Sequence, residues 1–363
     1  MGKQKTIPLF KVAMSKQANR AVNDVLQSGF VGQGKLVDEF EERLSPYAGG
    51  LPVVAMNSCT SAIHAVLTML GIGPGDEVVT TPLTCIATNS PIVSVGARPV
   101  WADVDSLTGN IDPRDVQRKL SSRTKAIMVV DWTGRPVDYE RLNFGIPIIE
   151  DSAHGPIINH RQTGDYVCFS FGPIKHLTCG DGGAVAVKNN IWQVEALRLT
   201  RWYGLDRIAS TDFRCEQNID RFGMKFHMNN INAAIGLANL PRLDAIVAAH
   251  QHNAKNLWDA FVGMNGITLA PYNSRSNYWV FPILVRDTKS RIRLKALCAE
   301  RGIMISQVHT RNDKHHAYRF PCGILPGLDD FDSRHVNLPC GWWLTKKDLE
   351  RIIDVVTEFA HGC

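Results

Sequence analysis

The sequence predicts an α/β protein, with a large N-terminal domain built on a mostly parallel central sheet and a smaller C-terminal α+β domain. Short apolar runs rich in β-branched residues alternate with helix-like stretches over the first two thirds of the 363 residues. Continuous runs of this kind suit strands buried on both faces of a parallel sheet, and the β-α-β-α order favours the same architecture. The pattern changes after about residue 245, so we expect domains at residues 1–245 and 246–363.

The expected elements follow the apolar runs along the chain. Strands are predicted over residues 51–57, 77–81, 98–104, 125–131, 147–150, 167–171 and 183–187. Helices are predicted over 60–70 and 87–95, the second weakened by Pro91. The later part of the chain should hold a long linking helix over 237–250, a strand over 277–285, a helix over 289–301 and a last helix that begins at Thr345 with Asp348 as its capping partner.

Composition excludes several classes of protein. The net charge is +5 and the basic residues are dispersed, so we expect neither a nucleic-acid arm nor a polybasic membrane patch. No apolar run approaches the ~20 residues of a membrane span. The nine cysteines are odd in number and form no CxxC pair. That usage argues against a disulfide framework or a thiolate metal site and favours the reduced cytoplasm.

The segment IIEDSAHG at 148–155 places an acid, Asp151, where an apolar strand ends. In open α/β sheets ligands lie beyond the carboxyl ends of the strands, so a carboxylate there faces the candidate site. Taken alone, the segment favours the other interpretation, in which Asp151 caps a turn.

A second segment, CFSFGPIKHLTCGDGGAVAV at 168–187, carries Lys175 between a strand and a glycine-rich turn. Partial burial there would lower the pKa of the lysine and leave a nucleophilic amine, although most loop lysines are simply solvated. Asp151 and Lys175 are 24 residues apart, 175 − 151 = 24. Together they are the two groups that pyridoxal phosphate requires, because the acid keeps the ring nitrogen protonated and the lysine carries the cofactor as a Schiff base.

A phosphate anchor is expected in the segment NSCTS at 57–61, between a strand and a helix. Backbone N–H groups and hydroxyls at a helix N-terminus favour an anion. An ordinary helix N-cap is the alternative interpretation.

At these residues the sequence resembles the DegT/DnrJ/EryC1/StrS family of sugar aminotransferases, over nearly the whole chain. The matching segments are SGFVGQG (28–34), FEERLSPYAG (40–49), NSCTSAIHAVL (57–67), GIGPGDEVVTTPLTCIATNSPI (71–92), PVWADVD (99–105), IIEDSAHG (148–155), FSFGPIKHLTCGDGGAV (169–185), GMKFHMNNINAAIGLANL (223–240) and LPCGWWLTKKDLERI (338–352). The resemblance implies the type I fold of pyridoxal-phosphate enzymes, the cofactor in its PLP and PMP forms, and a homodimer with the site at its interface.

The resemblance also implies residue roles. Lys175 looks like the Schiff-base lysine, which also moves the proton between Cα of the donor and C4′ of the cofactor. Asp151 looks like the partner of the ring nitrogen, and His154 stands near the ring hydroxyl. The phosphate contacts would come from Thr60, Ser61 and Ser170. Lys225 stands where many members have an asparagine that reaches the phosphate of the neighbouring subunit, and a lysine could act there as a point charge.

The sequence departs from the family pattern at four places. Cys85 occupies the usual position of an aromatic ring over the cofactor, and Cys59 replaces a common glycine in the phosphate turn. The stretches 138–147 and 154–166 are shorter than usual. Substrate specificity therefore cannot be transferred from relatives.

His309 and Arg311 belong to a polar cluster, HTRNDKHH, in the C-terminal part of the chain. A solvated loop is one interpretation. The other is a clamp for a substrate phosphate or a donor carboxylate, since arginine binds such anions in a bidentate way.

The resemblance implies an aminotransferase that moves an amino group from an amino acid, L-glutamate in most members, to a nucleotide-linked keto-deoxy sugar. Some members are dehydratases with histidine at the lysine position, so Lys175 favours transamination. A pyridoxal-phosphate-dependent sugar dehydratase or lyase of the same family remains one alternative, and a non-catalytic regulatory binding protein is another. The retained Asp151 and Lys175, and the lack of a helix-turn-helix pattern, argue against the regulatory protein.

Overall fold

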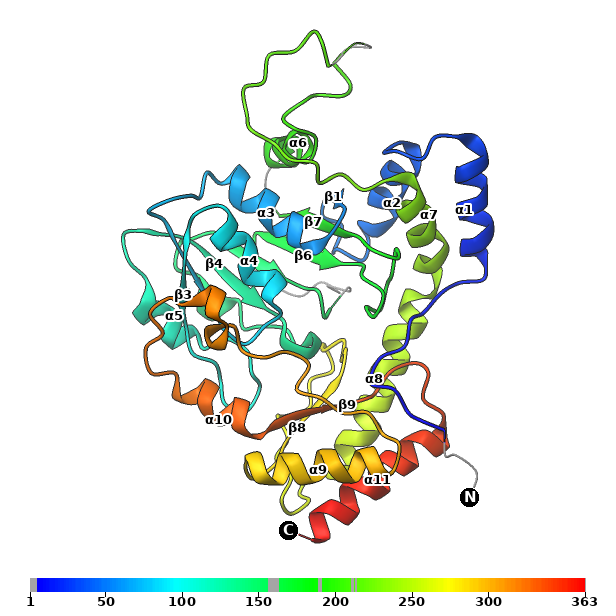
Figure 1. Cartoon of the computed structure of the whole chain (residues 1–363), viewed down its shortest axis with the longest axis vertical. Coiled ribbons are helices and arrows are strands. Elements are labelled where there is room, and N and C mark those ends of the chain that lie inside the picture. The colour runs from blue at the N-terminus through cyan, green and yellow to red at the C-terminus, as the bar shows by residue number, and fades with distance from the viewer. Residues whose placement is uncertain (1–4, 156–162, 189–190, 210–211, 213, 363) are drawn as a thin grey trace.

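The computed structural model describes residues 5–155, 163–188, 191–209, 212 and 214–362 (Figure 1). Within these ranges, none of the helices has the length and apolar character needed to cross a membrane. A seven-stranded sheet forms the centre, in the order β1-β7-β6-β5-β4-β2-β3. Its strands are β1 (Val53–Met56), β2 (Glu77–Thr80), β3 (Arg98–Trp101), β4 (Thr124–Val130), β5 (Ile148–Asp151), β6 (Tyr166–Ser170) and β7 (Gly183–Val187).

The sheet is mostly parallel, as the sequence predicted. Only β7 runs antiparallel to its neighbours β1 and β6. All seven expected strands form, with ends that shift by a few residues. Parallel pairing of β4, β5 and β6 brings their carboxyl ends to one edge, where Asp151 lies between Val130 and Cys168 in register. The sheet thus presents the last residue of β5 at the centre of that edge.

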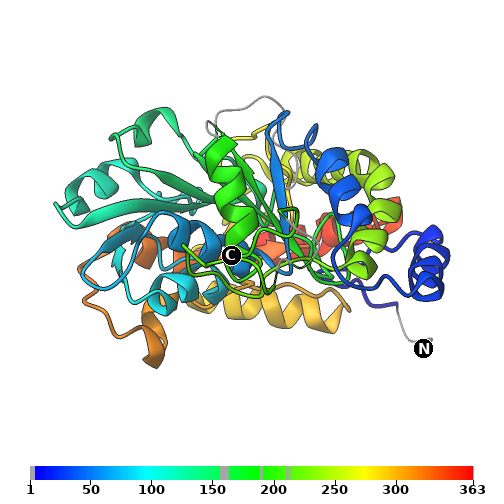
Figure 2. The same cartoon turned by 90° about the horizontal axis from the view of Figure 1, so that it is seen from above.

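Apolar cores cover both faces of the sheet, with one core on the first face and two cores along the second. Successive side chains of β1 alternate between the faces: Val54 and Met56 join the core on the first, and Val53 and Ala55 join a core on the second. The helices of this part are α1 (Gln17–Ser28), α2 (Lys35–Leu44), α3 (Cys59–Met69), α4 (Ile86–Ser94), α5 (Pro113–Lys119), α6 (Ile191–Thr200) and α7 (Asn230–Asn239). Figures 1 and 2 both place α1 beside α7 at one end of the molecule, with β3 at the opposite end of the sheet.

The prediction of one continuous helix over residues 237–250 is wrong. The chain instead forms α7, a short 3₁₀ turn η3 (Leu240–Arg242) and α8 (Leu243–Phe261). Pro241 lies in this turn, and a proline removes the N–H that an uninterrupted helix would need. The expected domain boundary at 245 falls in the first turn of α8, and the division of the chain there stays a prediction.

In the C-terminal part, α8 and later helices pack against a two-stranded antiparallel sheet. The elements of this part are β8 (Phe281–Leu284), α9 (Thr288–Glu300), α10 (Pro326–Arg334), β9 (His335–Leu338) and α11 (Lys346–His361), with short turns η1 (Trp132–Gly134), η2 (Glu140–Leu142), η4 (Asn312–Lys314) and η5 (His316–Tyr318) elsewhere. Thr345 and Asp348 form the expected capping box of α11. The strand predicted over 277–285 is shorter, because Tyr278 adopts a φ of 45° that a strand cannot accommodate.

Candidate active site

Asp151 and Lys175 come together at the carboxyl edge of the central sheet. Asp151 ends β5, and Lys175 follows β6 in a turn closed by a hydrogen bond from its own N–H to the carbonyl of Gly172 over 3.2 Å. The two groups are close enough for each charge to shift the pKa of the other. The pairing that the sequence suggested from spacing alone is therefore present in space.

The Asp151 carboxylate is buried and accepts three hydrogen bonds. Thr88 Oγ1 donates to Oδ2 over 2.6 Å, while the N–H of Ala153 donates to Oδ1 over 3.0 Å. The Cys59 thiol donates to Oδ1 over 3.8 Å. Burial raises the pKa of the Asp151 carboxyl, and these donors together with Lys175 act in the opposite direction. Three donors suit an acid that carries its negative charge inside the protein.

The position of the Cys59 side chain shows how the turn predicted to hold a phosphate accommodates a residue larger than glycine. Its side chain is buried and directed at Asp151. Burial raises the pKa of the Cys59 thiol well above its usual value, so the thiol stays protonated and can donate. By these contacts Cys59 supports the carboxylate at the centre of the site.

Lys175 lies with its amine against an aromatic ring. Its Nζ is 4.1 Å from the ring centroid of Trp279, a residue from the segment just before β8. Burial lowers the pKa of the Lys175 amine, and the nearby Asp151 carboxylate raises it in part. The lowered pKa increases the fraction of free, nucleophilic amine at neutral pH.

His154 and His309 add two uncharged imidazoles to the same site. The His154 ring stacks on Trp279 at 4.0 Å, and the His309 ring lies 6.0 Å from His154 in a nearly parallel plane. Burial lowers the pKa of His154 well below its usual value and that of His309 to about 4. His154 Nδ1 and His309 Nε2 are buried and have no hydrogen-bond partner in the described part of the chain. Both rings are therefore available to a ligand as neutral hydrogen-bonding groups.

The turn predicted to hold a phosphate lies at the N-terminus of α3. Ser58 caps this helix by accepting a hydrogen bond from the N–H of Ser61 over 3.0 Å. Gly183 of β7 passes directly beneath, since a Cβ there would approach the Cys59 nitrogen to 2.3 Å. The turn is thus both a capped helix start and a place of close backbone approach. Phosphate binding by Thr60 and Ser61 stays a prediction.

Three other predicted site residues surround the same edge. Ser170 is the last residue of β6 and is half-buried. Cys85 is half-buried at the N-cap of α4. Lys225 lies beside the phosphate turn of its own chain, because its carbonyl accepts a hydrogen bond from Asn57 Nδ2 over 3.2 Å. A contact of Lys225 with a neighbouring subunit stays a prediction.

The contacts of Arg311 argue against the anion clamp that was one interpretation of this residue, and the clamp itself stays a prediction. Its guanidinium binds Asp313 through two hydrogen bonds of 2.8 and 2.7 Å and Asp329 through one of 2.5 Å. These two carboxylates take three of the five guanidinium N–H donors and balance its positive charge, which a substrate anion would otherwise do. Arg311 therefore shapes the turn that follows His309, and His309 is the member of the pair that reaches the site.

Two residues of the site did not emerge from the sequence. Thr88 lies one turn into α4, a helix that was expected, but its bond to an acid 63 residues away has no sequence signal. Trp279 lies in a segment that was expected to be a strand. Its role depends on the irregular backbone around Tyr278, which no periodic pattern reveals.

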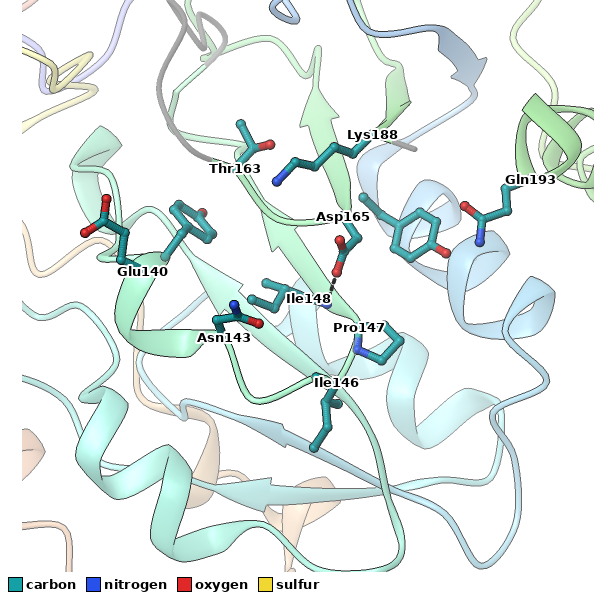
Figure 3. A pocket seen from close by; sticks show the side chains of 12 residues that line it. Glu140, Asn143, Ile146, Pro147, Ile148, Thr163, Asp165, Lys188 and Gln193 are labelled. Carbon is teal, nitrogen blue, oxygen red and sulfur yellow. Dashed lines mark hydrogen bonds between the residues drawn. The ribbon is translucent and has the colours of Figure 1, made fainter. Parts of the chain in front are cut away.

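A separate cavity of about 900 Å³ lies at the opposite edge of the sheet (Figure 3). It is bordered by Ile148 at the start of β5, by Asp165 just before β6, and by Lys188 just after β7. Asp165 Oδ2 accepts a hydrogen bond from the Ile148 N–H over 2.9 Å. The described neighbours of Asp151 and Lys175 do not line this cavity, so its size says nothing about the chemistry at the carboxyl edge.

Comparison with known proteins gives a consistent result over almost the full chain. The sequence model of the DegT/DnrJ/EryC1/StrS aminotransferase family matches residues 12–357. AtS13 from Actinomadura melliaura is 37% identical with a TM-score of 0.90, covering 98% of this chain and 99% of that one. The sugar aminotransferase CalS13 from Micromonospora echinospora is 34% identical with a TM-score of 0.89, covering 97% and 99%. The aminotransferase TlmJ from Streptoalloteichus hindustanus is 27% identical with a TM-score of 0.89, covering 98% and 99%.

Proposed function

Because the chain belongs to the DegT/DnrJ/EryC1/StrS aminotransferase family, we propose that it is a pyridoxal-phosphate-dependent sugar aminotransferase. Its amino donor is L-glutamate, and its acceptor is a keto-deoxy sugar carried on a nucleotide. The observation that carries this proposal is the buried Asp151 carboxylate placed beside the desolvated Lys175 amine. A neighbour of the same fold, Spr1654 from Streptococcus pneumoniae, has been solved in PLP and PMP forms.

The residues at the carboxyl edge fit pyridoxal phosphate. Asp151 would hold the ring nitrogen, Lys175 would bind the aldehyde carbon, and His154 would face the ring hydroxyl with its unpartnered Nδ1 side. The capped start of α3 and Ser170 would hold the phosphate, since helix N-termini favour anions. When bound, this cofactor supplies an electron sink that acidifies the Cα–H of an attached amino acid.

The protein's own groups would then divide the proton transfers between them. Lys175 would take the proton from Cα of the donor and return it at C4′ of the cofactor. A lysine with a lowered pKa can act in both directions at neutral pH. Asp151 keeps its charge through its three donors, and so holds a proton on the ring nitrogen.

The acceptor side of the site would be uncharged. His309 offers a neutral imidazole beside Lys175, with a pKa lowered to about 4 and a buried Nε2 that lacks a partner. Such a group suits the hydroxyl or keto oxygen of a sugar. The catalytic unit would be a homodimer, in which Lys225 of each chain helps to bind the phosphate at the shared interface.

The test asks whether the amino donor, without any sugar acceptor, transfers its amino group to the cofactor. Protein loaded with pyridoxal phosphate should convert it to pyridoxamine phosphate when L-glutamate is added, and borohydride reduction before that step should fix the cofactor on Lys175. Lys175→Ala should lose both results, whereas Lys188→Ala, in the cavity at the opposite edge, should keep them. Loading without formation of pyridoxamine phosphate from any amino acid would favour the lyase alternative. Failure of the wild-type protein to load would overturn the proposal.

A further inference from the structure

Ring stacking, a hydrogen bond and a cation contact hold the indole of Trp279 in place. It is 2% exposed and stacks with the ring of Phe10, at 4.5 Å, and with the ring of His154, at 4.0 Å. Its Nε1–H donates to the carbonyl of Ile174 over 2.9 Å, and the Nζ of Lys175 rests 4.1 Å from its ring centroid. Trp279 therefore contacts both the amine of Lys175 and the backbone of the preceding residue.

The backbone that carries Trp279 is strained. Four non-glycine residues in the described part of the chain have a positive φ, and three of them border this site: Thr133 at 58°, Tyr278 at 45° and Val308 at 71°. Val308 directly precedes His309, and a β-branched residue is an outlier in this conformation. A backbone hydrogen bond joins two of the strained segments, because the main-chain N–H of Trp279 donates to the carbonyl of Thr133 over 2.9 Å. Such strain persists only where surrounding contacts hold it, and it concentrates at functional sites.

We propose that Trp279 is a positioning residue for Lys175: its ring face holds the amino group toward the site, and its N–H fixes the carbonyl of Ile174. This proposal rests on the proposed function, because the proposed reaction needs the Lys175 amine in a set position. Trp279 acts through Lys175 and takes no part in the bond changes.

The ring face has an electrostatic consequence that a mere packing role lacks. An aromatic face attracts an ammonium group, so Trp279 favours the charged form of Lys175, whereas burial favours the neutral amine. Replacing the indole with an aliphatic side chain keeps the burial and removes the attraction. The amine should then lose its proton at lower pH.

The experiment uses the whole chain without cofactor. Each variant is labelled with trace acetic anhydride across a pH series, and the peptide that contains Lys175 is quantified by mass spectrometry. In Trp279→Leu the pH midpoint of Lys175 labelling should fall by about half a unit or more. Trp258→Leu is the matched control, because Trp258 also donates its N–H to a carbonyl, that of Ala270, and also has a lysine, Lys255, over its ring. Its midpoint for Lys175 should equal that of the wild type.

A second variant tests the hydrogen bond. Trp279→Phe keeps an aromatic face and removes the donor to Ile174, so the labelling midpoint should move little while borohydride-trapped capture of pyridoxal phosphate slows about fivefold. A folded Trp279→Leu variant with the wild-type midpoint overturns the proposal. If that variant does not fold, capture by Trp279→Phe at the wild-type rate overturns it instead. Wild-type protein that labels normally but never captures the cofactor contradicts the proposed function, and the midpoints still decide the role of Trp279.

Discussion

The hydroxyl of Thr88 donates a 2.6 Å hydrogen bond to Oδ2 of Asp151, linking α4 to the carboxyl end of β5. The Thr84 hydroxyl lies 2.6 Å from the same Thr88 oxygen and extends the contact to the turn before α4. Hydrogen bonds to a charged group are stronger than neutral ones, and burial strengthens them further. The segment between β2 and α4 therefore helps to decide whether Asp151 carries a charge.

Removing this donor should slow the enzyme and shift its pH dependence. In Thr88→Val the carboxyl loses a bond that lowers its pKa, so its pKa rises and the acid limb of the rate profile moves to higher pH. A bond to a charged group contributes about 1.5–3 kcal/mol, which corresponds to a rate loss of about tenfold to a hundredfold. The measurement is the pH profile of pyridoxamine phosphate formation. Thr88→Ser, which keeps the hydroxyl, should lie close to the wild type, and an unshifted profile for Thr88→Val would count against this role.

Gly183 should be intolerant of any side chain. A Cβ at this position would lie 2.3 Å from both the Cys59 nitrogen and the Ser58 carbonyl carbon, and those are backbone atoms of the phosphate turn. Gly183→Ala must therefore move β7 or α3, with a loss of about 1–3 kcal/mol of stability or more and weaker binding of the cofactor phosphate. Gly32→Ala is the control, because its Cβ would meet nothing within 4 Å. Denaturant unfolding and pyridoxal phosphate titration measure the two effects, and equal results for both variants would contradict the steric argument.

Periodic patterns predicted the fold well because the sheet depends on them. The seven strands lie in short apolar runs, and the alternation of the first strands with helices indicates a mostly parallel sheet, but the order of the strands in the sheet has no signal in the sequence. Asp151 and Lys175 could be paired because each lies next to a recognisable strand end. The break at Pro241 was missed because apolar spacing continues across it from α7 into α8.

The supporting residues could not be predicted in the same way. The bond of Thr88 to Asp151, and the strained turns that bring Trp279 and His309 to Lys175, depend on tertiary contacts between distant segments. Composition made Arg311 resemble an anion clamp, but its donors bind two carboxylates. Sequence alone does not show whether a charged group is already paired. The shortened stretch at 154–166 lies partly outside the described residues, since 156–162 are not described.

Substitutions of His309 and of Arg311 should have different effects, the first on acceptor binding and the second on stability. His309→Phe removes a neutral hydrogen-bonding group from the site and should raise KM for the sugar acceptor about tenfold without a comparable change for L-glutamate. Arg311→Met removes the cation from the half-buried Asp313 carboxylate and should cost about 3 kcal/mol of stability, with the acceptor KM nearly unchanged in the folded protein. Steady-state kinetics with each substrate and denaturant unfolding test both variants. A large acceptor KM effect from Arg311→Met would restore the clamp interpretation.

Buried neutral histidines should make the protein lose stability as the pH falls. Burial lowers the pKa of His250 and of His335 from 6.5 to about 4 in the folded chain. Between these values the unfolded chain binds protons that the folded chain excludes, so each histidine should lower the unfolding free energy by up to about 1.4 kcal/mol per pH unit. Above the unfolded-state pKa both states are neutral and the effect vanishes. His250→Gln, whose amide can still donate to the carbonyl of Tyr278, should reduce the stability slope between pH 6.5 and about 4 by up to one proton. Urea unfolding across this range measures the slope, and a slope identical to that of the wild type would show that His250 is protonated in the folded protein as readily as in the unfolded chain.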